Sequence, residues 1–363
     1  MLFPYVDKNT PFVLSPESLD WYLSKGWYRM GGHIFTTHFL FFQEQPFSAI
    51  WIRQDLKTHQ FSKSQRKLMR KNAKLFDVAS GPRIIDVERE ELYVRYAANF
   101  DGHLSPTISD SLEDYKVNTS IFNTWETTIR DKISGKLVAV SYFDLGRTST
   151  ASILGIYDPL LSTFSLGYYT MLLEMKFCHE RRLEYYYPGY VVPGYQRFDY
   201  KLRLRASEYF DLRSERWIPY NLEDISHNGP VESQRRILGN LAVLLHPEGP
   251  VSTGLYVYPL FEAKLYDSNT DNYLAYPYFV PLGRDSENTL VLVVYDPSEE
   301  VFIVLHCSLV PNTMLSFKLS HLGGSVGVNY FTDLLRVEKL LLRSSSVEAI
   351  HDLLQQATQD LNS

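Results

Sequence analysis

The sequence predicts a mixed α+β fold in which antiparallel strands lead into a strand–loop–helix–strand crossover. Two strand-like runs, residues 125–130 and 136–143, flank a Ser-Gly turn, which is the pattern of a hairpin. A third strand over residues 151–157 stops at an Asp-Pro pair, and a helix with apolar residues at three- and four-residue spacing follows. A fourth strand over residues 183–187 ends at Pro188-Gly189. A crossover of this kind is right-handed and leaves its two strands parallel.

Changes in pattern divide the chain into three regions. Residues 1–76 are rich in aromatic side chains and end in a cationic helix, and residues 77–216 contain the crossover. Two antiparallel strands followed by such a crossover is the order of the GNAT acyltransferase fold. We therefore expect a small N-terminal domain, a GNAT-like catalytic domain in the middle region, and a strand-rich C-terminal extension over residues 217–363.

The C-terminal extension has a structural pattern and no recognisable catalytic constellation. A helix is expected over residues 232–245, and a hairpin is expected from the apolar runs at 289–295 and 301–305. An amphipathic helix is expected over residues 331–343. We interpret this region as a structural or partner-binding module.

The composition is that of a globular protein without a membrane segment. Apolar residues make up 45% of the 363 residues, charged residues make up 21%, and the net charge is −6. Any affinity for nucleic acid must therefore come from a local basic patch. Only two cysteines occur, Cys178 and Cys307, so we expect two buried thiols and no thiolate-bound metal. The first residues lack the pattern of a signal peptide, and we expect a cytoplasmic protein.

A cationic helix is the sharpest local signal. Ser62 and Gln65 form a capping box that predicts a helix start, and Leu68 and Leu75 can dock the helix. Six basic residues recur on one face: Lys63, Arg66, Lys67, Arg70, Lys71 and Lys74. Like charges on one stripe repel unless an anion neutralises them, and a phosphate backbone would do so. The alternative is a solvated basic face.

Two further segments could bind ligands. The loop with Ser165 and Gly167 opens a helix, where free backbone amides and the helix dipole can hold an anion; a generic helix start is the alternative. After the fourth strand, the alternation from Tyr200 to Arg205 predicts a strand with Lys201, Arg203 and Arg205 on one face. The tyrosines near this strand could instead be packing residues, and the basic strand could be an exposed sheet edge.

Together these segments resemble the arginyl/leucyl-tRNA–protein transferase family, which performs N-end rule aminoacylation. The similar segments cover about residues 20–210, and they are Gly26–Gly31, Arg53, Phe61–Asn72, Tyr157–Pro159, Ser165–Gly167 and Tyr185–Lys201. One feature of the family is missing, because residues 33–46 contain none of the cysteines that its members carry there.

The resemblance implies that a protein α-amine attacks the ester of an aminoacyl-tRNA, with no cofactor and no membrane partner. Asp158 would steer the amine, and Tyr187 or Tyr190 would donate to the developing oxyanion. The implied substrate-binding residues are Gly189, Tyr200, Lys201, Arg203, Ser165 and Gly167, with Lys201 and Arg203 pairing with an acidic acceptor. The implied tRNA-binding residues are Arg53, Arg66, Lys67 and Arg70. Two alternatives stay open: an acyl-CoA N-acyltransferase, and a non-catalytic adaptor with this fold.

Overall fold

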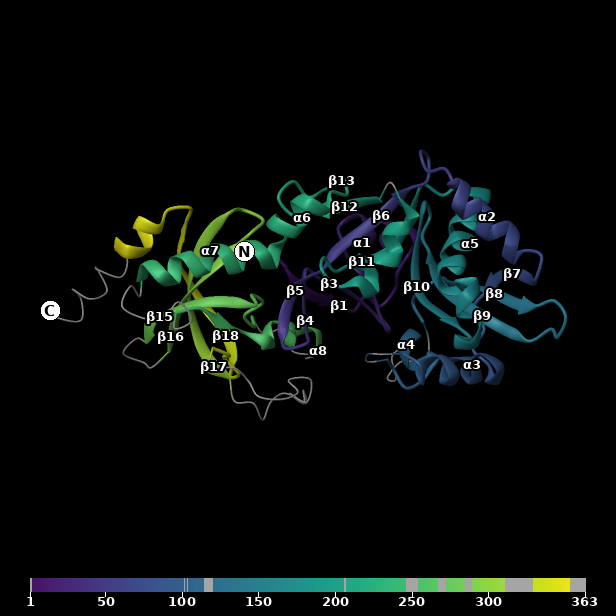
Figure 1. The fold of residues 1–363 in the computed structure, drawn as a ribbon. Helices are drawn as coiled ribbons and strands as arrows, with labels where there is room; N and C mark the ends of the chain where they lie inside the picture. The colour runs from purple at the N-terminus through teal and green to yellow at the C-terminus, as the bar shows by residue number, and fades with distance from the viewer. Residues whose placement is uncertain are drawn as a thin grey trace.

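The computed structural model describes an elongated molecule with a large sheet at one end and a smaller sheet at the other (Figure 1). The residues that it describes are 2–100, 102, 104–113, 120–205, 207–245, 254–266, 272–284, 289–310 and 329–352.

The large sheet has eight strands in the order β13-β12-β6-β11-β10-β9-β8-β7. Its strands are β6 (Ile50–Asp55), β7 (Phe76–Pro82), β8 (Thr124–Asp131), β9 (Leu137–Leu145), β10 (Ser149–Tyr157), β11 (Tyr185–Val191), β12 (Ser207–Asp211) and β13 (Arg216–Pro219). Only β10 and β11 are parallel, and helix α5 (Leu166–Glu180) connects them. The predicted hairpin, crossover and mixed α+β fold class are therefore confirmed.

The parallel pair separates soon after it starts. Residues 149–151 of β10 pair with residues 185–187 of β11, and no pairs between the two strands follow. β10 then bulges and continues along β9, whereas β11 bulges and continues along β6. The prediction that the fourth strand ends at Pro188 is wrong, because the bulge accommodates the proline inside the strand.

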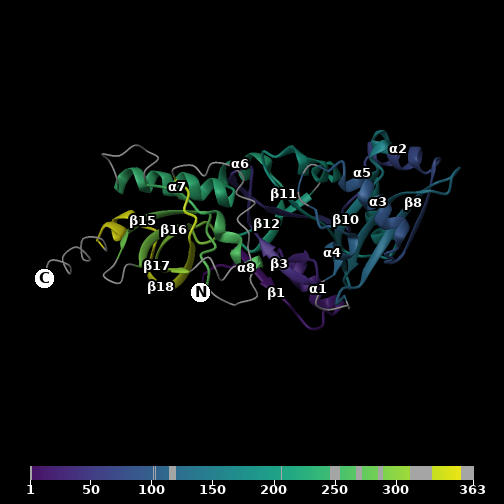
Figure 2. The same cartoon turned by 90° about the horizontal axis from the view of Figure 1, so that it is seen from below.

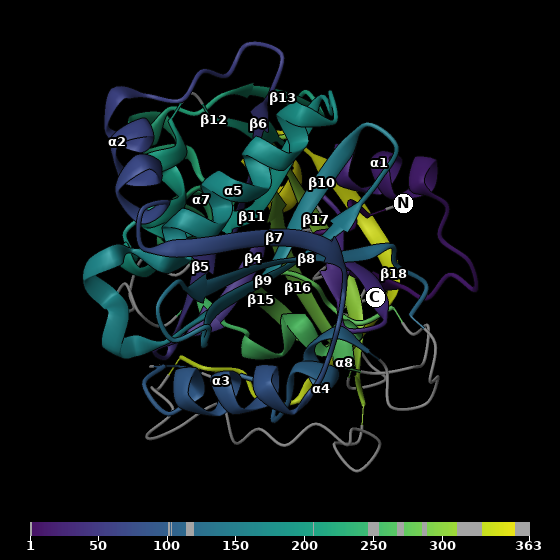
Figure 3. The same cartoon turned by 90° about the vertical axis from the view of Figure 1, so that its right-hand side faces the viewer.

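Helices cover both faces of the large sheet, as Figure 3 shows from its end. Helices α5 and α2 (Lys63–Asn72) lie on one face, where Leu68 and Met69 pack into the core formed by α5. Helices α3 (Val87–Ala97) and α4 (Ile108–Leu112) lie on the other face and bury Leu92 and Tyr93.

A three-stranded sheet and a hairpin lie between the two ends of the molecule, where Figure 1 labels β1, β3, β4 and β5 and Figure 2 shows β1 and β3 from below. These N-terminal elements are β1 (Val6–Asn9), α1 (Pro16–Ser24), β2 (Tyr28–Met30), β3 (His33–Thr37), β4 (Phe39–Phe42) and β5 (Gln45–Ser48). The division expected at residue 76 remains a prediction, and the large sheet extends across it, because β6 lies between β11 and β12.

The C-terminal region forms a five-stranded sheet packed by helix α7 (Pro230–Leu245). Its other elements are α6 (Leu222–Asn228), β14 (Tyr256–Val257), η3 (Pro259–Glu262), α8 (Ala263–Tyr266), β15 (Tyr278–Arg284), β16 (Leu290–Asp296), β17 (Val301–Val310) and β18 (Leu334–Ser344). The predicted helix at 232–245 and the predicted hairpin are confirmed. Tyr5, Val6 and Phe39 from the N-terminus belong to the same hydrophobic core.

Two predicted elements are wrong. Residues 331–343 contain strand β18 and not a helix, because pairing with β17 provides a non-local partner for their apolar side chains. Residues Tyr200–Arg205 are not a strand: the segment lies mostly in a 3₁₀ helix, η2 (Gln196–Leu204), in which Leu204 is buried. Alternation of apolar and basic residues over so short a segment cannot distinguish a strand from a 3₁₀ helix, and tertiary packing selects the helix.

Cys178 and Cys307 are both buried, as expected, and lie in different hydrophobic cores. Across the described ranges, none of the helices is long and apolar enough to cross a bilayer.

Candidate functional site

The point where β10 and β11 separate is held by a tyrosine from the N-terminal region. The hydroxyl of Tyr28 lies within hydrogen-bond distance of the carbonyl oxygens of Ser152 and Tyr187, at 2.9 Å from the latter. These carbonyls lie on the two separating strands, so Tyr28 satisfies backbone groups where the ladder has stopped. The sequence motif around residues 26–31 gave no indication of this role.

Gly189 and Lys201 meet next to this point. Gly189 has a φ of +92°, and a Cβ there would lie 3.2 Å from Lys201 Nζ. Glycine is therefore favoured by the backbone conformation, and a Cβ at this position would displace the ammonium by a few tenths of an ångström. Lys201 Nζ donates to the carbonyl oxygen of Tyr190 at 2.9 Å. Burial lowers the pKa of Lys201 to about 7, so its charge is poorly solvated.

The two candidate oxyanion donors differ in their surroundings. Tyr187 is buried, and Arg53 provides a hydrogen bond to it, so its hydroxyl is already engaged. Tyr190 is partly exposed, with its ring against Trp51 and Phe198 at 5.2 and 5.4 Å. Tyr190 is therefore the better placed of the two, and the role of both as oxyanion donors stays a prediction.

Asp158 is engaged away from these residues. Its carboxylate caps η1 (Pro159–Phe164) through the Leu160 N–H at 3.1 Å. Lys136 and Arg95 lie 3.4 and 3.8 Å from its other oxygen. The two cations come from the start of β9 and from α3, and not from β11. The structure therefore does not bring Asp158 together with Tyr187 and Tyr190. Its steering role stays a prediction without geometric support.

The loop that opens α5 is shaped by packing. Ser165 has a φ of +50° and makes no side-chain cap. A Cβ at Gly167 would lie 2.9 Å from the ring of Tyr157, so glycine allows that ring to pack. Tyr200 is 41% exposed, on η2. Substrate binding by Ser165, Gly167 and Tyr200 stays a prediction.

Helix α2 presents its charges to solvent. The capping box of Ser62 and Gln65 is present as predicted, and all six basic residues are exposed. Within the described parts of the chain, no carboxylate forms an ion pair with any of them. Leu68 docks the helix, but Leu75 is 41% exposed, so its predicted docking role is wrong. The helix ends at Asn72.

The structure separates Arg53 and Arg203 from the groups proposed for them. Arg53 pairs with Glu208 at 2.7 Å and stacks 4.0 Å from the Tyr185 ring, on the sheet face opposite to α2. It is therefore not part of the α2 surface. Arg203 does not accompany Lys201: its guanidinium is exposed over the Tyr168 ring at 4.3 Å. Its carbonyl oxygen accepts from the Tyr168 hydroxyl at 2.8 Å, beside the start of α2.

A buried carboxyl lies beneath the separating strands. Glu174 of α5 is fully buried, and its Oε2 accepts from the Tyr186 hydroxyl at 2.7 Å. Burial raises the pKa of Glu174 to about 7. A single Glu in an apolar helix has no distinctive spacing, so the sequence pattern did not indicate this residue.

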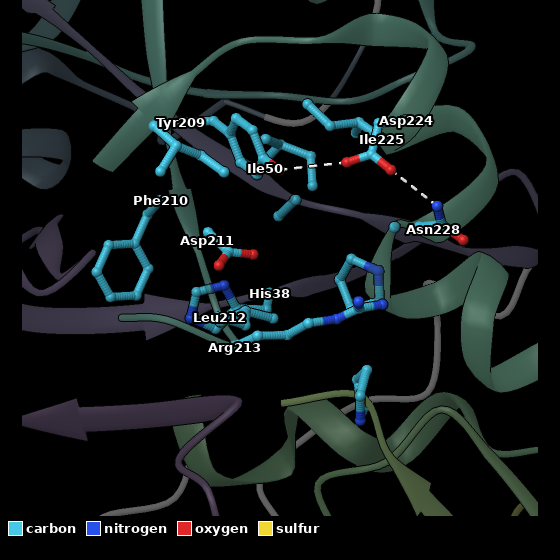
Figure 4. A pocket seen from close by; sticks show the side chains of 15 residues that line it. His38, Ile50, Tyr209, Phe210, Asp211, Leu212, Arg213, Asp224, Ile225 and Asn228 are labelled. Carbon is cyan, nitrogen blue, oxygen red and sulfur yellow. Dashed lines mark hydrogen bonds between the residues drawn. The ribbon is translucent and has the colours of Figure 1, made fainter. Parts of the chain in front are cut away.

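A pocket of about 210 Å³ lies elsewhere, between β12, α6 and the β16–β17 turn (Figure 4). Asp224 and Asn228 line it, joined by a hydrogen bond of 2.8 Å. His38 also lines it, and burial lowers its pKa to about 3, so the ring is neutral. No predicted site residue lines this pocket.

Comparisons with known proteins cover the part of the chain that contains the crossover. Residues 88–211 match the family described as arginine-tRNA-protein transferase, C terminus. An aspartate/glutamate leucyltransferase of Leptospira interrogans is 26% identical over 200 residues, which are 53% of this chain and 73% of that protein. Arginyl-tRNA--protein transferase 1 of Dictyostelium discoideum is 30% identical over 94 residues, 24% of this chain and 15% of that protein. The solved structure of FemX aligns with a TM-score of 0.33 at 11% identity, covering 53% of this chain and 64% of FemX.

These matches place the protein in the class of aminoacyltransferases. The similarity to the C-terminal domain of the arginine-tRNA–protein transferases covers residues 88–211 of the 363.

Proposed function

We propose that this protein transfers arginine or leucine from an aminoacyl-tRNA to the N-terminal amine of an acceptor protein. The family match over residues 88–211 carries this proposal, because that range contains the separating strands, Gly189 and Lys201. The two candidate amino acids correspond to those in the names of the related transferases.

The tRNA side of the proposal rests on helix α2. Arg66, Lys67 and Arg70 are exposed cations without carboxylate partners in the described structure, on a chain whose net charge is −6. Exposed like charges on one helix are destabilising, and phosphate contacts would remove that cost while releasing counterions. Arg203 lies beside the start of this helix and extends the same cationic surface.

The acceptor side rests on Lys201. A partly buried ammonium whose pKa is lowered to about 7 lacks a counter-charge. A carboxylate from an acceptor that begins with Asp or Glu would supply this charge through a charge-assisted hydrogen bond. Tyr190, whose carbonyl oxygen already fixes Lys201, would present its hydroxyl to the reacting ester.

Positioning of the two substrates can supply most of the catalysis in this reaction. The aminoacyl ester is already activated, and an α-amine has a pKa of about 7.7–8.0, so roughly a tenth of it is unprotonated at pH 7 and a weak base suffices to free the rest. Attack on the ester carbonyl forms the new amide bond, and the ribose oxygen leaves with a proton. Holding the amine and the ester together converts a bimolecular step into an effectively unimolecular one.

A transfer assay tests this function directly. Purified protein is mixed with labelled Arg-, Leu- or Phe-tRNA and with peptides that begin with Asp, Glu, Lys or Arg. We expect label on the peptides that begin with Asp or Glu. No transfer together with stabilisation by CoA would instead indicate an acyl-CoA enzyme, and no binding of either ligand would indicate an adaptor.

A further inference from the structure

Four partly exposed side chains meet at the far end of β10, where β11 no longer pairs with it. They are Tyr96 in the last turn of α3, Phe100 shortly after that helix, Tyr157 at the end of β10, and Arg197 on η2. The ring centres of Tyr96 and Tyr157 lie 5.2 Å apart, and those of Tyr96 and Phe100 lie 5.4 Å apart. The Arg197 guanidinium lies 3.9 Å from the centre of the Phe100 ring. We call these four residues the aromatic wall.

The aromatic wall crosses the edge of β10. Tyr96 packs against the core beneath α3, and Tyr157 packs against the core beneath α5, on the opposite face of the sheet (Figure 3). Their rings can meet because β11 pairs with β10 only over residues 149–151, well before Tyr157. The partly exposed rings therefore line a strand edge that β11 has left open.

One end of the aromatic wall is joined to helix α2 through the start of α5. A Cβ at Gly167, in the first turn of α5, would lie 2.9 Å from the Tyr157 ring. Three residues earlier, the carbonyl oxygen of Phe164 accepts a hydrogen bond of 2.9 Å from Asn72 Nδ2, at the end of α2. The Lys71 ammonium of α2 lies 5.2 Å from the centre of the Phe164 ring. The aromatic wall is therefore continuous with the cationic helix that is proposed to bind tRNA.

The other end of the aromatic wall leads to Tyr190 and Lys201. Arg197 precedes Phe198, whose ring centre lies 5.4 Å from that of Tyr190 and 5.3 Å from Lys201 Nζ. The wall thus connects the proposed tRNA surface with the residues proposed for the reaction.

The chemistry of the aromatic wall fits an unpaired nucleotide. Among the described side chains, no carboxylate forms an ion pair with Arg197, so its charge is available to a ligand. Aromatic rings stack on unpaired bases of any sequence, and an adjacent guanidinium binds phosphate. An acceptor that begins with Asp or Glu offers an anion without a planar ring to stack.

We propose that the aromatic wall stacks an unpaired base at the aminoacylated 3′ end of tRNA, and that Arg197 binds a phosphate of the same end. Helix α2 then holds the double-stranded part of the tRNA, and the wall guides the single-stranded end towards Tyr190. This inference rests on the proposed function, because it takes aminoacyl-tRNA as the ligand.

The test compares two deacylated RNAs by filter binding: intact tRNA, and the same tRNA without its unpaired 3′ end. We expect wild-type protein to bind the intact tRNA roughly tenfold or more tightly than the shortened one. Tyr96→Leu and Arg197→Met should each lower this ratio by about fivefold or more, by weakening the binding of intact tRNA alone. Tyr96→Phe should keep the wild-type ratio, because stacking needs the ring and not the hydroxyl.

Trp21→Leu and Arg236→Met are the matched controls, since they remove an exposed ring on α1 and an exposed guanidinium on α7, and neither should change the ratio. Circular dichroism checks that each variant is folded. The inference is overturned if wild-type protein binds the two RNAs equally, or if folded Tyr96→Leu and Arg197→Met keep the wild-type ratio. Failure of aminoacyl transfer, with the ratio and its loss in these variants as expected, would refute the transfer reaction alone.

Discussion

Two cationic regions of the molecule, helix α2 and the Lys201 end of η2, differ in what surrounds their charges. The basic residues of α2 are exposed, so their charges are solvated by water. The ammonium of Lys201 lies against Tyr190 and Phe198, where burial lowers its pKa to about 7. The first region suits a ligand with many repeated charges that arrives through solvent. The second suits a single charge placed by close contact.

The largest expected effect concerns α2. Arg66→Glu combined with Arg70→Glu should weaken tRNA binding by about 100-fold or more at moderate salt, because phosphate contacts become repulsive. The slope of log Kd against log salt should also fall by about two. A filter-binding titration over several salt concentrations measures both quantities.

Arg235→Glu with Arg236→Glu is the control, because these residues are exposed on α7 and the change in net charge is the same. If both double variants weaken tRNA binding equally, the α2 surface has no special role and the comparison fails.

The next effect concerns Lys201. Lys201→Met should lower kcat/KM for an Asp peptide by roughly 10- to 150-fold and leave an Asn peptide almost unchanged, since one charge-assisted contact is lost. Arg203→Met should not change the ratio between the two peptides, because Arg203 points away over Tyr168. If Lys201→Met and Arg203→Met gave the same ratio of kcat/KM for the Asp peptide to kcat/KM for the Asn peptide, Lys201 would not be the residue that binds the acceptor carboxylate.

The lowered pKa of Lys201 also predicts a pH dependence. The ammonium is present below pH 7 and lost above it, since burial lowers its pKa to about 7. The preference for Asp over Asn should therefore be constant below pH 7 and fall about tenfold per pH unit above it. The ratio removes the titration of the peptide amine, which both peptides share. A preference that is flat up to pH 9 would show that Lys201 stays charged or does not contact the acceptor.

The smallest effect is on stability. Burial raises the pKa of Glu174 to about 7 from its usual 4.5. The free energy of unfolding therefore falls as pH rises from about 4.5 to about 7, because the unfolded chain loses this proton more easily than the folded protein does. Glu174→Gln should stabilise the protein by about 3 kcal/mol at pH 8 and hardly at all at pH 4.5. Urea denaturation at both pH values measures this. Glu180→Gln, at the exposed end of the same helix, should show no such difference.

Local signals in the sequence predicted local structure well. The Ser62–Gln65 capping box and the two hairpins depend on neighbouring residues, and the structure confirms them. The errors at residues 331–343 and around Lys201 arose where distant partners select the conformation, namely β17 for the first, and Gln65 and Tyr168 for the second.

The site was predictable only in part for the same reason. Gly189 and Lys201 lie close in sequence and in space, so a motif could indicate both. Tyr28 and Glu174 reach the same neighbourhood from distant segments and have no spacing pattern that connects them. Conversely, Asp158 lies in a motif, but its contacts are with a helix cap and two cations.

Tyr5, the residue before the N-terminal strand, has partners that the ribosome adds much later. The hydroxyl of Tyr5 donates to Asp296, which is 291 positions later, and also accepts the N–H of Ser298 at 2.9 Å. A ribosome that adds 5–20 residues per second needs about 15–60 s between these residues. During that time Tyr5 and Val6, which belong to the C-terminal hydrophobic core, lack most of their packing partners. Slowing translation between Tyr5 and Asp296 should therefore expose newborn chains to chaperones for longer, even though every finished contact stays the same.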